Sequence, residues 1–315
     1  YAPAQALQIL EPENGNEVVA QQFKALDESR QLSNNLLLTK LEKSAKSGDV
    51  KAQFSLANIY HNGIGIKTDE KLAFYWYMQV AEQGYASAQF NIANGYYYGI
   101  GTTQDLTKAK IWYEKAAEQD FVNAQYNLAV MYRRGEGAEV DNELAFYWYE
   151  RAAQLGYGVA QLTLAKLYEE GIGAEQDDNL AQIWYLKAAK QYDPEAQFYL
   201  ADFYHKRSHY AQAVYYYRQA ADQGYVSAQY ALAMNLISGT GVIKDEIQAQ
   251  KLLLDASQAG HAKAQLQLGQ LFLANDQIIK AKKWLTKASA QQESTATILL
   301  EDLVTLEQSK RDDLV

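Results

Sequence analysis

Residues 124–156 read AQYNLAVMYRRGEGAEVDNELAFYWYERAAQLG, and this stretch contains one complete copy of a pattern that fills most of the chain. Its opening Ala-Gln pair recurs in phase at seven positions, and successive in-phase pairs lie 36 residues apart except for one interval of 32 residues. The alanines of the seven pairs are Ala52, Ala88, Ala124, Ala160, Ala196, Ala228 and Ala264. A fixed period of this length is the signature of a repeat architecture, in which each copy stacks on the next.

The first half of each copy has the spacing of a helix that buries one face. In the copy quoted above, Leu128 and Tyr132 lie four and eight residues after Ala124, on one helical face. Ala129 is small, as close packing of a second helix requires. We therefore expect a first helix over about residues 50–62 of the first copy and over the equivalent residues of the others.

The second half of each copy begins with a turn and continues as a second helix. The glycine at position 135 suits the left-handed residue that ends a helix, and Asp141 is placed to cap the helix that follows. That helix carries Ala145 and then Trp148. All five tryptophans of the chain occupy this one repeat position, which predicts packing residues rather than a ligand site.

The repeat divides the chain into three predicted segments. Residues 49–293 form an array of seven helix-turn-helix copies, residues 1–48 form an N-terminal extension with capping helices, and residues 294–315 form a C-terminal capping helix and tail. The predicted fold class is an all-α, right-handed α/α superhelix, or solenoid.

The two ends of the array carry further expectations. Residues 17–29 and 34–47 are predicted to be helices that precede the first copy. A terminal helix is predicted over residues 295–308, and three of its residues are expected to face the array: Ile298, Leu299 and Leu303. Terminal elements of this kind cover the exposed ends of a repeat array.

The phased pattern resembles the Sel-one-like repeat (SLR) family, which is related to tetratricopeptide (TPR) repeats. The resemblance rests on Ala-Gln-x-x-Leu-Ala-x-x-Tyr, then Gly-x-Gly, then Asp-x-x-x-Ala-x-x-Trp-Tyr-x-x-Ala-Ala, over about residues 40–290. It implies a non-catalytic scaffold or adaptor, bacterial in origin, whose first helices line a concave surface that binds a protein or peptide segment.

The family that the chain resembles also suggests alternatives. Its bacterial members take part in host-cell entry, exopolysaccharide export and envelope assembly. The alternative function is therefore a periplasmic accessory protein for exopolysaccharide export or envelope assembly. A secreted host-interaction factor and an enzyme are less favoured.

Composition and charge exclude several function classes. The formal net charge of −9 argues against general nucleic-acid binding, which needs a basic surface. No stretch of about 18 apolar residues predicts a membrane span. The chain has no cysteine, which excludes disulfides and thiol catalysis within it. It starts at Tyr1 without methionine, so we expect a periplasmic or secreted protein after removal of a signal, with a cytoplasmic protein as the alternative.

No motif in the sequence predicts a cofactor, a metal or a catalytic group. The Gly-x-Gly pairs lack the third glycine of a phosphate-binding loop and lie between two predicted helices. His205 and His209 are four residues apart, but no third ligand is evident nearby, so we expect exposed polar residues at a turn.

A row of large apolar side chains marks a candidate partner-binding groove on the first helices. These residues lie two positions after the anchor alanines, and we expect five of them to contact a partner: Phe54, Phe90, Tyr126, Phe198 and Tyr230. The alternative is that the row fills gaps between adjacent first helices.

Polar residues on the same helices extend this predicted groove. Six positions after the anchors, the amides of Asn58 and Asn94 can bond a peptide backbone, and Lys166 adds a charge. The groove is therefore predicted to be rich in amides in its first two copies.

The ends of the first helices complete the predicted groove, nine and ten positions after the anchors. They supply Tyr97 and Tyr98 in the second copy and Arg133 and Arg134 in the third. The two arginines can hold a carboxylate, which makes an anionic polysaccharide the alternative partner. A solvated pair of charges is the other interpretation of these arginines.

Overall fold

A computed structural model describes residues 36–312 of the chain. All regular structure among these residues is helical, which confirms the predicted all-α fold class. Residues 36–46 are helical and precede α2. The later helices are α2 (Val50–Asn62), α3 (Glu70–Ala81), α4 (Ala86–Tyr98), α5 (Leu106–Ala117), α6 (Val122–Arg134), α7 (Asn142–Gln154), α8 (Gly158–Glu170), α9 (Asp178–Ala189), α10 (Pro194–Lys206), α11 (Tyr210–Asp222), α12 (Val226–Ser238), α13 (Glu246–Gln258), α14 (Ala262–Ala274), α15 (Ile278–Ser289) and α16 (Ser294–Asp312).

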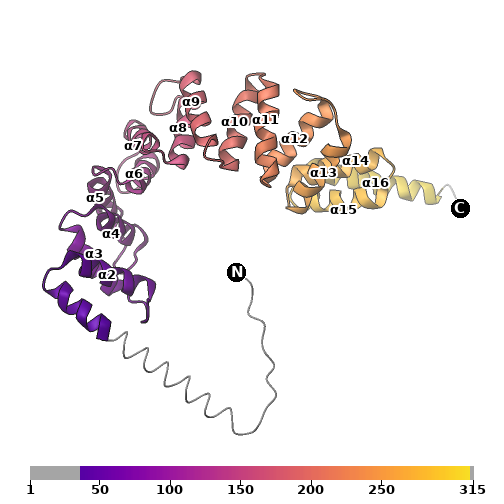
Figure 1. Ribbon diagram of the computed structural model, residues 1–315. Helices are drawn as coiled ribbons and strands as arrows, with labels where there is room; N and C mark the ends of the chain where they lie inside the picture. The colour runs from indigo at the N-terminus through magenta and orange to yellow at the C-terminus, as the bar shows by residue number, and fades with distance from the viewer. Residues whose placement is uncertain (1–35, 313–315) are drawn as a thin grey trace, which may run out of the picture. The chain divides into compact units, whose positions relative to one another are not determined.

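The chain divides into two compact units, which we call unit 1 (up to Trp148) and unit 2 (from Tyr149). In unit 1, α2 packs on α3, α3 on α4, α4 on α5 and α5 on α6. In unit 2, each helix from α8 to α15 packs on its successor in the same way (Figure 1). Within each unit the two-helix repeats therefore stack in sequence, in the manner of an α/α solenoid.

The core of each repeat is formed by the residues whose phase predicted burial. In the second repeat, Ile92 and Ala93 of α4 and Ala109 of α5 are all fully buried. Four of the five tryptophans are also buried, while Trp112 is half-buried. These rings lie between helices, which confirms that the tryptophan position is a packing position.

The predicted caps are present at the helix ends. The carboxylate of each in-phase aspartate accepts a backbone N–H from the first turn of the second helix, as Asp105 does from Lys108 at 3.0 Å. The aspartates that act in this way are Asp69, Asp105, Asp141, Asp177 and Asp245. The first glycine of each Gly-x-Gly pair ends the preceding helix with a positive φ, for example 72° at Gly99.

The second glycine of the pair has a different role, because it lies against the preceding repeat. A Cβ atom built on Gly101 would lie 2.2 Å from the carbonyl oxygen of Glu70, at the start of α3. The same contact recurs in the next repeat, where a Cβ on Gly137 would lie 2.3 Å from the carbonyl oxygen of Leu106. The glycine pair thus ends one helix and allows two repeats to approach closely.

The glutamine of the Ala-Gln pair is buried in six of the seven repeats, and in five of them it bonds to the preceding helix. Gln89 Nε2 donates to the carbonyl oxygen of Ala81, in the last turn of α3, at 3.3 Å. Its Oε1 accepts from Gln119 Nε2 at 2.7 Å. The same carbonyl also accepts the backbone N–H of Gly84 at 3.0 Å, so the glutamine is its second donor at the end of the helix. Equivalent bonds to the preceding helix are made by Gln53, Gln125, Gln161 and Gln265.

The fifth repeat replaces its missing glycine pair with an arginine. The Nε–H of Arg207 donates to Asp178 Oδ2 at 2.8 Å, and its Nη1–H donates to Glu169 Oε1 at 3.4 Å. These bonds connect the turn after α10 to the fourth repeat. Ser208 supplies the left-handed residue, with φ of 63°. This turn therefore keeps the inter-repeat contact by an ion pair instead of a close backbone approach.

The ends of the array follow the predicted helices in part. Residues 36–46 are helical, and Leu38, Leu41 and Ala45 pack into the core of the first repeat. The predicted helix over residues 17–29 lies outside the described residues.

At the other end, α16 packs against α15 through three leucines, Leu299, Leu300 and Leu303. The prediction for Ile298 was wrong, because this residue is 57% exposed. It points away from the face that the three leucines share, since each helical residue turns by about 100° from its neighbour. No helix in the described part of the chain has the length and apolar character that crossing a membrane requires.

Candidate functional site

Three open cavities lie along the first helices of successive repeats, and each is named after one of its residues. The His61 cavity, of about 200 Å³, lies between the first and second repeats. The Arg134 cavity, of about 220 Å³, lies between the second and third repeats. Both belong to unit 1, whereas the Lys166 cavity, of about 240 Å³, lies between the fourth and fifth repeats in unit 2.

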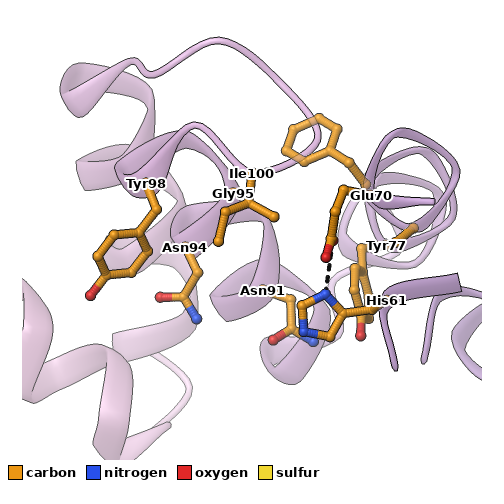
Figure 2. Close-up of a pocket in the computed structure, with 10 residues that line it drawn as sticks. His61, Glu70, Tyr77, Asn91, Asn94, Gly95, Tyr98 and Ile100 are labelled. Atoms are coloured by element: carbon orange, nitrogen blue, oxygen red, sulfur yellow. Dashed lines mark hydrogen bonds and ion pairs between the residues drawn. The ribbon is translucent and has the colours of Figure 1, made fainter. Parts of the chain in front are cut away.

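The His61 cavity combines an apolar wall with amide groups (Figure 2). Asn91, Asn94 and Tyr98 come from one face of α4, since they are three and four residues apart. His61, at the end of α2, closes the opposite side, and its Nδ1 lies 2.9 Å from Glu70 Oε2.

A glycine shapes the apolar wall of this cavity. The wall consists of Phe74, Tyr77 and Ile100. Gly95 of α4 lets Phe74 come close, because a Cβ on this glycine would lie only 2.7 Å from the ring. The cavity thus places apolar surface directly beside amide groups.

Buried tyrosines of the second helices orient the asparagines of the first helices. Tyr77 Oη donates to Asn58 Oδ1 at 2.7 Å, and Tyr113 Oη donates to Asn94 Oδ1 at 2.5 Å. Each asparagine therefore turns its oxygen toward the core and leaves Nδ2 as a donor on the helix face. Burial raises the pKa of Tyr77 to about 12 and also raises the pKa of Tyr113, so both hydroxyls keep their protons at neutral pH.

The Arg134 cavity is lined mainly by tyrosines, with Tyr97, Tyr98 and Tyr126 among them. Tyr97 Oη donates to Glu136 Oε2 at 2.6 Å, and this hydrogen bond, together with burial, raises the pKa of the tyrosine. Arg134 lines the same cavity, and its Nη1 atom lies 3.7 Å from Glu136 Oε1. The cavity thus offers aromatic rings beside one guanidinium group.

The Lys166 cavity is more strongly charged, and its charges are engaged with one another. Lys166 Nζ lies 3.2 Å from the centre of the Tyr199 ring, a cation–π contact. Lys206 Nζ donates to Glu169 Oε1 at 3.1 Å.

The pKa values of two carboxyl groups in this cavity shift in opposite directions. Burial opposes ionisation of Glu169, but hydrogen bonds from Tyr185 and Lys206 outweigh it and lower the pKa of the carboxyl. Burial raises the pKa of Asp202, although this carboxylate accepts the Tyr217 hydroxyl.

The predicted aromatic row is half-buried, and most of its rings pack on the second helices. Phe54 lies 5.7 Å from Tyr77, and Phe90 lies 5.8 Å from Tyr113, between ring centres. The remaining rings of the row have similar contacts: Phe198 lies 5.8 Å from Tyr217, and Tyr230 stacks on His261 at 4.8 Å. Of the five predicted contacts, Tyr126 is the one that lines a described cavity.

The other predicted residues fall into two groups. Asn94, Tyr97, Tyr98, Arg134 and Lys166 all line one of the three cavities, and Tyr98 lines two of them. Asn58 and Arg133 line none of them. Asn58 is half-buried and bonded to Tyr77, whereas Arg133 is exposed at the end of α6.

One row of residues that line the cavities was not predicted from the sequence. Asn91, Asn127 and Tyr199 each lie three positions after an anchor alanine and each line a cavity. Helical geometry could have found them, because offsets of three, six and ten residues share one helical face.

The tyrosine that follows four of the five tryptophans was also missed as a site residue. Tyr77, Tyr113 and Tyr185 reach the cavities from the second helices. No group of three or more potential metal ligands lies together among the described residues. His205 and His209 are exposed, as predicted.

Comparisons with known proteins agree with the repeat register. The Sel1 repeat family matches seven consecutive segments: residues 50–85, 86–121, 122–157, 158–193, 194–225, 226–261 and 262–293. A search of the curated proteins found no match.

Two solved structures are similar over most of the chain. A protective antigen with an SLR fold from uropathogenic Escherichia coli is 34% identical, with a TM-score of 0.76, over 82% of this chain and 57% of its own. This chain therefore spans little more than half of the length of that antigen's chain. A Sel1 repeat protein from Oxalobacter formigenes is 26% identical, with a TM-score of 0.73, over 96% of this chain and 97% of its own.

The family matches cover most of the chain, and their boundaries follow the helix pairs that the structure describes. Repeats of this kind typically bind proteins or peptides and generally act as non-catalytic interaction scaffolds. The chain belongs to the Sel1 repeat family.

Proposed function

We propose that this protein is a non-catalytic scaffold that binds an extended segment of a partner protein along the first-helix face of its repeats. The observation that carries the proposal is the pair of bonds from Tyr77 to Asn58 and from Tyr113 to Asn94. An extended segment presents unbonded backbone carbonyl groups, and an oriented amide N–H is the donor that they require.

Two further observations support the same face. The His61 and Arg134 cavities adjoin each other, since Tyr98 lines both, so one extended segment can occupy the two in succession. Tyr98 is 63% exposed, and an exposed aromatic ring supplies large contact area with little loss of side-chain entropy on binding.

A photo-crosslinking experiment in the native cells tests this proposal. A photoreactive phenylalanine replaces Tyr98 in one variant of the full chain and Tyr75 in the matched control. Tyr75 is a comparably exposed tyrosine on α3, away from the cavities. We expect protein adducts at position 98 that weaken when Asn58 and Asn94 are changed to alanine, and no adducts at position 75. Equal adducts at both positions, or adducts that the asparagine changes do not affect, would contradict the proposal.

The proposal also includes a bacterial origin and a periplasmic or secreted location. Both similar structures come from bacteria, and one of them is a protective antigen. The absence of cysteine is compatible with either compartment. Fractionation of the native cells followed by immunoblotting tests the location, and a signal confined to the cytoplasm would contradict it.

A second candidate is an accessory role in polysaccharide export, for which the exposed Arg133 is the specific observation. A cation without a carboxylate nearby can attract an acidic polymer through solvent. Retention of the full chain on immobilised alginate at low salt, and its loss in Arg133→Gln, is the expected result for this role.

A further inference from the structure

The cavity face of unit 1 carries unengaged positive charge in a protein of net negative charge. Among the described residues, Arg133 has no ion-pair partner, and Arg134 has only Glu136, at 3.7 Å. The other oxygen of Glu136 accepts the Tyr97 hydroxyl at 2.6 Å. Glu70, the carboxylate of the His61 cavity, is engaged by His61 at 2.9 Å. Both of these carboxylates therefore have partners within the chain, and the arginines at the end of α6 are the groups that attract a ligand charge.

The same face carries amide donors without acceptors. Asn94 Oδ1 is held by Tyr113, and its Nδ2 has no acceptor in the part of the chain that the structure describes. The side chain of Asn91, one turn earlier on α4, makes no hydrogen bond to any described residue. These donors match the backbone carbonyl groups of an extended peptide, which alternate along its two sides.

The apolar wall of the His61 cavity defines the third contact. Phe74, Tyr77 and Ile100 surround a space of about 200 Å³, which is large enough for one aliphatic side chain. This wall distinguishes between the two candidate classes of polymer. A polysaccharide presents hydroxyl groups on every side and would leave them unbonded against the wall, whereas a leucine or isoleucine side chain buries apolar surface there.

We propose that unit 1 binds an acidic, extended peptide segment of a partner protein. An aliphatic side chain of the segment occupies the His61 cavity, its backbone accepts from Asn91 and Asn94, and an aspartate or glutamate pairs with Arg133 and Arg134. This inference rests on the proposed function and adds the chemistry of the partner segment.

The charged cavity of unit 2 lacks this preference. Its Lys206 is paired with Glu169, and its Lys166 lies over the Tyr199 ring. An acidic ligand there would have to displace an existing ion pair. The expected selectivity for acidic segments therefore belongs to unit 1.

Selection from a displayed library of random 12-residue peptides on the immobilised full chain tests the proposal. We expect the enriched peptides to be acidic and to contain an aliphatic residue together with an aspartate or glutamate. One enriched peptide, synthesised with a fluorescent label, then gives affinities by anisotropy. Changing Arg133 and Arg134 to glutamine should weaken its binding by roughly two- to thirtyfold, since two charge pairs are lost.

A matched variant controls for net charge. Lys67→Gln with Lys71→Gln removes two exposed cations of unit 1 that lie away from the cavities, so the net charge changes equally. This variant should bind the peptide as the unchanged chain does. Raising the salt concentration from 50 to 300 mM should weaken binding to the unchanged chain and have a smaller effect on the arginine variant.

The possible outcomes separate this inference from the proposed function. Enriched peptides without acidic residues, whose binding is lost in Asn94→Ala, would overturn the inference and leave the proposed function standing. No enrichment over a chain that carries Asn58→Ala and Asn94→Ala would overturn both. Displacement of the acidic peptide by alginate at equal charge concentration would assign the arginines to a polysaccharide and overturn the peptide assignment.

Discussion

Replacing Tyr113 by phenylalanine removes one oxygen atom from the core of unit 1 and leaves the ring in place. Tyr113 is 1% exposed. Its hydroxyl donates to Asn94 Oδ1 at 2.5 Å and accepts from Asn127 Nδ2 at 3.2 Å. Each such bond contributes about 0.5–1.5 kcal/mol to stability. Both amides are half-buried and can turn toward water, so we expect a loss of about 1–2 kcal/mol in the free energy of unfolding.

Guanidinium denaturation followed by circular dichroism measures this loss. Tyr75→Phe is the matched control, because Tyr75 is 51% exposed and makes no hydrogen bond among the described residues. It should change the free energy of unfolding by less than about 0.5 kcal/mol.

A double-mutant cycle separates the Tyr113–Asn94 bond from other effects of the substitution. The changes Tyr113→Phe and Asn94→Ala, alone and together, should show a coupling of about 0.5–1.5 kcal/mol, since the second change has less to remove once the first is made. Strictly additive losses would refute the claim that the tyrosine orients this asparagine, and so would a Tyr113→Phe variant as stable as the control.

Three further predictions concern the repeat framework. Gly101→Ala should lower the free energy of unfolding by at least about 2 kcal/mol more than Gly84→Ala in thermal or chemical denaturation. Both glycines have positive φ, but only Gly101 lies against a backbone carbonyl. Equal losses would contradict the close approach of the two repeats at Gly101. Gln89→Leu should cost about 0.5–1.5 kcal/mol in the same assay, since the hydrogen bond from Gln89 to the Ala81 carbonyl oxygen is lost; an unchanged midpoint would contradict this role. Burial lowers the pKa of His261, whose Nδ1 caps α14, so its contribution is present above about pH 6.5 and is lost as the pH falls through the folded-state pKa. Acidification from pH 7.5 to 5.5 should therefore lower the free energy of unfolding more in the unchanged chain than in His261→Asn, which keeps a cap without titrating.

The repeat phase predicted the helices because every element of the phase has a local physical cause. Offsets of zero, four and eight residues place Ala88, Ile92 and Tyr96 on one face of α4, and the side chains that bury this face follow directly. The capping aspartates and the helix-ending glycines act within their own turn of the chain. Because these contacts are local, the caps predicted from the sequence are confirmed in the structure.

The role of the buried glutamines could not be predicted in the same way. A glutamine at a buried position requires partners, but those of Gln89 are a backbone carbonyl of the preceding helix and the side chain of Gln119, 30 residues later. Sequence spacing gives no indication of main-chain partners in another helix. The same limit applies to Arg207, whose contacts with Asp178 and Glu169 depend on how two repeats stack.

For the candidate site, the repeat phase predicts several residues that line cavities but not the depth of each side chain. Offsets of six and ten residues gave Asn94, Tyr98 and Arg134, which do line cavities. The offset of two residues gave Phe54 and Phe90, whose rings are drawn toward the tyrosines of the second helices. An aromatic ring at the border of a helix face packs on whichever neighbour is closest, and that neighbour is known only once the two helices are placed.

The distribution of conserved and variable repeat positions within this one chain explains how such a scaffold acquires specificity. The positions that join repeats vary little, because in most copies the buried glutamine bonds to a backbone carbonyl of the preceding helix. The offset of six residues faces a cavity and meets no such requirement, and it holds Asn94, Lys166 and Asp202 in different copies. In three copies a buried tyrosine hydroxyl still reaches a polar residue of this face, Asn58, Asn94 or Asp202. In these three copies the tyrosine supplies the same donor beneath a variable face, so a substitution at this offset can change what the cavity binds while the glutamine and glycine contacts between repeats remain.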